Sequence, residues 1–205
     1  MNAALNPAIV VPDTIGAPFE GGFYGGRIRI AEAVFAVCWA PKAEGEVQGA
    51  WLDRYESVPN AASCFDSEAN TKAMAVAGSE LANKVLALEI DGIKGWSVPA
   101  RDVLELAYRH LKPTTEENSG SFRDGDNPSS IPAGYPYTET LPAQTTVAAF
   151  QDDGAECFEE EWYWSSTQYS DYYAWSQGFS GGTQDGHYKV AEGRCRAVRL
   201  IQLST

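Results

Sequence analysis

The chain has 205 residues, of which 44% are hydrophobic and 12% are aromatic, so one domain with a sizeable core is the simplest expectation. No apolar run approaches the roughly 18 residues that a membrane-spanning helix requires, which argues against membrane insertion. The formal net charge is −13, and residues 114–161 hold eleven acidic side chains against the single Arg123. Because a surface that follows phosphates needs positive charge, nucleic-acid binding is disfavoured.

The cysteines give little sign of a metal or redox centre. Cys38, Cys64, Cys157 and Cys195 form no Cys-x-x-Cys pair, and the chain has only two histidines. A zinc site built from cysteine and histidine is therefore not expected, and no cofactor is predicted. We interpret the cysteines as buried free thiols, while one or two disulfides are also compatible with their number.

The N-terminal quarter predicts an arm followed by a hairpin. Residues 1–20 contain three prolines and no periodic apolar pattern, which is typical of an extended attachment arm. They also lack the basic start and continuous apolar stretch of a secretory signal. Arg27–Ile30 and Ala33–Trp39 are rich in strand formers and are separated by two residues, so we expect a β-hairpin.

Two helices are predicted next. Asp66–Ala87 carries apolar residues at steps of three and four, and Asp66 or Ser67 is a suitable N-cap. A second helix is indicated from Pro99 to Lys112, with a proline near its start and a Lys-Pro stop at its end. Its core-facing residues are expected to be Val103, Leu104, Ala107 and Leu111.

The second half predicts a long loop and then strands. Residues 114–160 are rich in turn formers and read as a loop insertion. Because the order is hairpin, helix, helix, loop and strands, we predict an α+β fold. The strand candidates form an expected antiparallel meander: Trp162–Ser166, Ala174–Phe179, Gly186–Val190 and Cys195–Ile201.

Two motifs carry a family resemblance. GWSVP at 95–99 leads into RDVLEL at 101–106, and YWSST at 163–167 is followed by Ala174-Trp175, Phe179, Gly182 and RCRAVR at 194–199. Over roughly residues 90–201 this order resembles the family typified by the C-terminal domain of a Legionella collagen-like protein, also called DUF1566. The resemblance implies a C-type lectin-like fold over residues 21–205.

The chain departs from that pattern in two places. The family commonly has threonine where Ala100 stands, so a helix-capping hydroxyl worth about 1 kcal/mol is missing. The EPN, QPD and WND triplets of calcium-dependent lectins are also absent, so calcium-mediated sugar binding is not expected.

Other segments look like proteins of tailed bacteriophages: GGFYGGRIRI at 21–30, Ala40-Pro41-Lys42 and PAQTTVAAF at 142–150. This resemblance implies a non-enzymatic virion protein of the phage tail, made in the host cytoplasm. It would be a homotrimeric tail-fibre or tail-tip component that binds other tail proteins and a host-surface receptor, either a protein or a glycan. The alternatives are a structural tail or baseplate protein, a bacterial surface adhesin, and a formylglycine-generating type of enzyme that uses Cys157 and Cys195.

The predicted recognition surface lies between Ser165 and Tyr188, where 13 of 24 residues are Tyr, Ser or Gly. Tyrosine offers rigid contact area, while serine and glycine offer adaptable hydrogen bonding. We predict receptor contacts from Tyr169, Ser170, Asp171, Tyr172, Tyr173, Asp185, His187 and Tyr188, although a plain hairpin turn at His187-Tyr188 remains open. Framework roles are expected for Trp96, Trp164, Trp175, Arg196 and Arg199. No catalytic residue is predicted, because runs such as Asp152-Asp153 and Glu159–Glu161 are typical of a solvated acidic edge.

Overall fold

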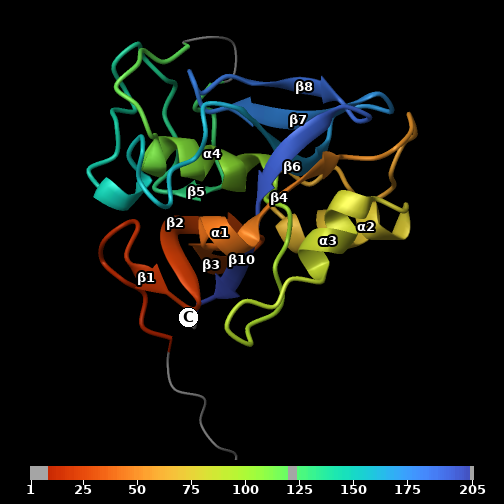
Figure 1. Cartoon of the computed structure of the whole chain (residues 1–205), viewed down its shortest axis with the longest axis horizontal. Coiled ribbons are helices and arrows are strands. Elements are labelled where there is room, and N and C mark those ends of the chain that lie inside the picture. Colours follow the sequence, from red (N-terminus) through yellow and green to blue (C-terminus); the bar gives the residue numbers. More distant parts are fainter. Residues whose placement is uncertain (1–8, 120–123, 204–205) are drawn as a thin grey trace, which may run out of the picture.

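The computed structural model describes residues 9–119 and 124–203, which form two five-stranded sheets and four helices (Figure 1). The α+β class predicted from the sequence is confirmed. The first sheet has the order β1 (Pro18–Phe19), β2 (Gly22–Ile30), β3 (Ala33–Trp39) and β10 (Val198–Gln202), and β5 (Ser130–Ile131) also pairs with β2. The second sheet has the order β4 (Glu46–Ala50), β9 (Glu192–Arg196), β6 (Trp162–Gln168), β7 (Tyr173–Gly178) and β8 (Gln184–Tyr188). The helices are α1 (Lys42–Gly45), α2 (Ser67–Val76), α3 (Glu80–Leu86) and α4 (Arg101–Leu111), with a 3-10 turn at Ala148–Phe150.

The predicted hairpin is confirmed as β2 and β3, which pair antiparallel across the link at residues 31–32. The strand β2 is longer than expected and begins at Gly22. A Cβ atom on Gly22 would lie 2.1 Å from the carbonyl oxygen of Trp39. Only glycine therefore allows the start of β2 to approach the end of β3 this closely.

The described part of the N-terminal arm docks on the first sheet. Residues 1–8 of that arm lie outside the described residues. The short strand β1 pairs with the start of β2, and the Gly16 amide donates a hydrogen bond to the Tyr24 carbonyl. Phe19 is buried, with its ring centroid 5.8 Å from that of Tyr24. Residues 9–20 thus add an edge to the sheet.

The single helix predicted over residues 66–87 is wrong, because two helices occupy this stretch. Gly78, at a φ of 89°, breaks the chain between α2 and α3. Ser79 begins the second helix by accepting a hydrogen bond from Ala82 N at 3.2 Å. The predicted cap Asp66 is confirmed, since its side chain accepts from Ala69 N.

Helix α4 packs against strands of both sheets (Figure 1). Its residues are buried around nearly the whole circumference of the helix. Its N-cap residue is Ala100, whose side chain cannot accept a hydrogen bond. Hydroxyl groups from two other elements take over this role. Ser67 Oγ accepts from Ala100 N at 2.8 Å, and Thr167 Oγ1 accepts from Arg101 N at 2.9 Å. The missing hydroxyl is thus replaced from α2 and β6.

The C-terminal strands follow the predicted meander only in part. Strands β6, β7 and β8 pair antiparallel in sequence order. The last candidate, Cys195–Ile201, divides at Ala197 into β9 and β10, which belong to different sheets. Ala197 connects the two strands: its N–H donates to the Gly45 carbonyl, and its own carbonyl accepts from the Ala40 N–H. The meander was wrong here because β9 pairs with β4, a strand that the sequence did not predict.

The predicted loop insertion is mostly irregular in its described part, where β5 and the 3-10 turn are the regular elements. Residues 120–123 lie outside the described residues. Of the helices in residues 9–119 and 124–203, none is long and apolar enough to cross a lipid bilayer.

Candidate recognition surface

Five tyrosines gather at one end of the second sheet, and we call them the tyrosine band. Each ring contacts the next, and the series ends on Trp175. The centroid distances are 5.3 Å for Tyr172–Tyr55, 6.1 Å for Tyr55–Tyr188, 4.6 Å for Tyr188–Tyr173, 6.4 Å for Tyr173–Tyr169 and 4.9 Å for Tyr169–Trp175. Four of these tyrosines were predicted from the sequence, whereas Tyr55 was missed because it lies in the distant segment after β4.

Strand register and a tight turn position the band. Tyr173 and Tyr188 stand directly opposite each other on β7 and β8, so their side chains share one face. The turn between β6 and β7 is closed by Ser170, whose hydroxyl accepts from Tyr172 N at 3.2 Å and from Tyr173 N at 3.1 Å. Ser170 therefore shapes the turn, while Asp171 beside it is exposed.

The rings of the band are exposed to solvent and also contact one another. The exposed fractions are 59% for Tyr169, 55% for Tyr172, 50% for Tyr188 and 49% for Tyr55. These four residues are about half exposed, Tyr173 is partly buried, and all five rings contact a neighbouring ring. Such preorganised aromatic side chains lose little conformational entropy when a partner binds.

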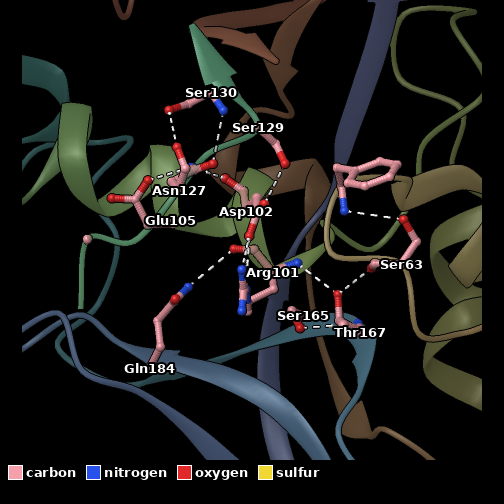
Figure 2. Close-up of polar contacts among 12 residues, drawn as sticks. Ser63, Arg101, Asp102, Glu105, Asn127, Ser129, Ser130, Ser165, Thr167 and Gln184 are labelled. Carbon is pink, nitrogen blue, oxygen red and sulfur yellow. Dashed lines mark hydrogen bonds and ion pairs between the residues drawn. The ribbon is translucent and has the colours of Figure 1, made fainter. Parts of the chain in front are cut away.

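A polar network surrounds the start of α4 (Figure 2) and reaches the Trp175 end of the band through Arg101. Arg101 Nε and Nη2 both donate to Asp102 Oδ1, at 2.9 and 2.6 Å, and Ser129 Oγ donates to Asp102 Oδ2 at 2.6 Å. Gln184 Nε2 donates to the Arg101 carbonyl at 3.2 Å, which ties β8 to the start of α4. The Arg101 guanidinium lies 5.6 Å from the ring centroid of Trp175, close enough for a cation–π contact.

Trp175 itself departs from its prediction as a core framework residue. Its side chain is only partly buried. The strand β7 places Trp175 on the same face as Tyr173, where Arg101 covers one side of the indole and Tyr169 contacts another. Trp175 therefore packs between Arg101 and the end of the tyrosine band at Tyr169.

Lys189 joins the segments that carry the band and was also missed from the sequence. Its Nζ donates to the Glu56 carbonyl and to Gln168 Oε1, both at 2.6 Å, and lies 4.7 Å from the ring centroid of Trp51. Its backbone N–H donates to the Tyr172 carbonyl. Burial lowers the pKa of Lys189 to about 8.

Asp185 and His187 do not belong to the tyrosine band. Successive side chains of a strand point to opposite faces, so both residues lie on the face of β8 away from Tyr188. The His187 ring stacks 6.0 Å from Trp162 and lies 5.7 Å from Trp164. A groove of about 290 Å³ is found there, lined by Gln48, Glu161, Trp162, His187, Glu192 and Arg194. The predicted recognition surface is thus two surfaces on opposite faces of one sheet.

The chain matches no known family model and no curated protein sequence. Within the described residues, no three His, Cys, Asp or Glu side chains converge to hold a metal ion. What can be inferred of function therefore comes from the two surfaces themselves.

The other framework residues make their polar contacts within or beside their own sheets. Trp96 and Trp164 are buried, and their indole N–H groups donate to the carbonyls of Ile93 and Gly49 at 3.1 Å. The buried Arg196 pairs with Glu46 at 2.9 Å. Arg199 is only partly buried; it donates to the Glu20 carbonyl at 2.8 Å and lies over the Trp96 ring.

Cys38, Cys157 and Cys195 are buried thiols outside any disulfide, as the sequence predicted, whereas Cys64 is only partly buried. Burial raises the pKa of the Cys38 thiol to about 12 and that of Cys195 still further, which makes both thiols poor nucleophiles at neutral pH. Cys157 differs from them because Lys42 Nζ lies 3.2 Å from its sulfur.

Proposed function

We propose that the protein is a receptor-binding component of a bacteriophage tail, with a C-type lectin-like fold, and that the tyrosine band contacts the host surface. The recognition role is supported by the convergence of four half-exposed tyrosines and the partly buried Tyr173 from two segments far apart in sequence, while the tail assignment rests on the sequence resemblance. A cluster of rigid, exposed aromatic rings is the typical centre of a recognition surface.

The band would recognise its partner by ring stacking, with tyrosine hydroxyls and Asp171 adding hydrogen bonds at the rim. Residues such as these usually account for most of a binding energy, because the ring is desolvated on binding at little entropic cost. The strong negative charge of the chain favours a partner surface with cationic groups. Binding by each copy need not be tight, since a homotrimer on one fibre combines several weak contacts.

The described arm at residues 9–20 supports an attachment role for the N-terminal side. It lies on the first sheet, whereas the tyrosine band belongs to the second sheet. The two ends of the domain would thus serve different partners, with tail proteins on one side and the host receptor on the other.

Adsorption of phage particles to host cells tests this proposal. Particles carrying the Tyr55→Ala/Tyr172→Ala double variant are compared with particles carrying Trp162→Ala, which removes an exposed aromatic side chain from the opposite face. Loss of two contact tyrosines, at about 1–2 kcal/mol each, predicts at least a tenfold fall in adsorption for the double variant alone. Equal adsorption of wild type and double variant, both with native circular dichroism, would reject the band as the receptor site.

A further inference from the structure

An amine and a thiol lie in direct contact where the long loop returns to the domain. Lys42 begins α1, and Cys157 lies near the end of the loop insertion. Lys42 Nζ is 3.2 Å from Cys157 Sγ and 2.5 Å from Glu159 Oε1. The backbone N–H of Lys42 donates to Glu156 Oε2 at 2.7 Å. Contacts on both sides of Cys157 thus hold the lysine against the sulfur.

The amine and the thiol are both partly exposed to solvent. Cys157 is 7% exposed, while the Lys42 side chain is 22% exposed. The Cys157 carbonyl accepts from Arg196 Nη2 at 3.3 Å, so the backbone at the sulfur is fixed. Cys38 and Cys195 are fully buried, and burial suppresses their reactive thiolate form.

We propose that Lys42 and Cys157 form a covalent sulfenamide crosslink when the protein meets a peroxide. First, the Cys157 sulfur attacks hydrogen peroxide and loses two electrons to the O–O bond, which gives a sulfenic acid and water. The Lys42 ammonium then loses a proton to Glu159, which passes it to the departing hydroxyl group as the nitrogen attacks the sulfur. The S–N bond forms as the S–O bond breaks, and the oxygen leaves as a second water. The protein has lost two hydrogen atoms, and one peroxide has become two waters.

The crosslink would protect the domain in two ways. Capture by the amine stops Cys157 at a reversible stage, before sulfinic acid can form. The bond also joins α1 to the end of the loop insertion, next to the buried Glu46–Arg196 ion pair. A covalent link between segments so far apart in sequence restricts the unfolded chain and raises the denaturation midpoint. The inference does not depend on the proposed receptor binding.

Mass spectrometry after peroxide treatment tests the proposal. The purified full chain is exposed to hydrogen peroxide, free thiols are blocked, and the protein is cleaved with trypsin and a glutamate-specific protease. We expect the peptides of Lys42 and Cys157 to be joined with the loss of two hydrogens, cleavage after Lys42 to be blocked, and dithiothreitol to reverse both effects.

The Lys42→Arg variant is the matched control, because it keeps a cation beside Glu159 without an amine that can form the crosslink. Its Cys157 should instead react with dimedone or advance to sulfinic acid. Cys64 is more exposed and reports in the same digest that the oxidant has acted. If Cys64 is oxidised in the wild type while Cys157 stays a thiol, or carries dimedone with no link to Lys42, the proposal is overturned.

Discussion

Replacing Thr167 by valine should remove the hydroxyl that caps α4 from outside the helix. Thr167 Oγ1 accepts from Arg101 N at 2.9 Å and donates to the Ser63 carbonyl at 2.8 Å. The side chain is only 1% exposed, so water cannot replace either bond. Valine has nearly the same shape, and the substitution therefore tests the hydrogen bonds with little change in packing.

The expected magnitude follows from these two bonds. Losing an N-cap interaction costs about 1 kcal/mol, and leaving a buried polar group without a partner costs about 1–3 kcal/mol. We expect Thr167→Val to lower the free energy of unfolding by about 2–4 kcal/mol. Thr167→Ser keeps the hydroxyl and loses only a methyl group, for which we expect about 1 kcal/mol.

Urea denaturation followed by tryptophan fluorescence measures both variants, because several of the six tryptophans are buried. At equal m-values, the comparison of wild type with the valine variant measures the hydroxyl, and that of wild type with the serine variant measures the methyl group. If valine is no more destabilising than serine, α4 does not depend on a cap from β6, and our account of its start is wrong.

Three further outcomes are expected. Gly22→Ala should lower the free energy of unfolding by about 3 kcal/mol because its Cβ would meet the Trp39 carbonyl oxygen. Gly92→Ala, with open space around it, should lower it by about 1 kcal/mol. Urea denaturation of each variant measures both values. The folded-state pKa of Lys189 lies below its ordinary value of 10.5, so folding releases a proton between about pH 8 and 10.5. Over that range the wild type should therefore gain about 1 kcal/mol of stability relative to Lys189→Met, and a constant difference would contradict the assignment. The crosslinked wild type should denature at higher urea than the peroxide-treated Lys42→Arg variant; equal midpoints would show that the bond does not brace the loop.

The sequence predicted those elements whose formation depends on residues close together in the chain. The hairpin was predictable because its two strands are adjacent in sequence and rich in strand-forming residues. Helix α4 was predictable from its apolar residues and the Lys-Pro stop. The exposure of Tyr169 and Tyr172 also followed from their place in a turn between strands.

Features that depend on distant contacts were not predictable in this way. Nothing local indicates that Ala197 crosses from one sheet to the other, because the crossing is fixed by Ala40 and Gly45. Tyr55 joins the tyrosine band through its contacts with Tyr172 and Tyr188, which are far from it in sequence. Strand alternation by itself predicts that His187 and Tyr188 point to opposite faces of β8. Placing both residues on one face was therefore an error of interpretation.

The position of the tyrosine band in an assembled phage tail tests the central claim most directly. Electron cryomicroscopy of the particle would show which surfaces of each copy face solvent at the distal end. We predict that Tyr55, Tyr172 and Tyr188 are exposed there and that residues 9–20 face other tail proteins. If the band is instead buried against another tail protein, it serves assembly, and the proposed receptor contact is contradicted.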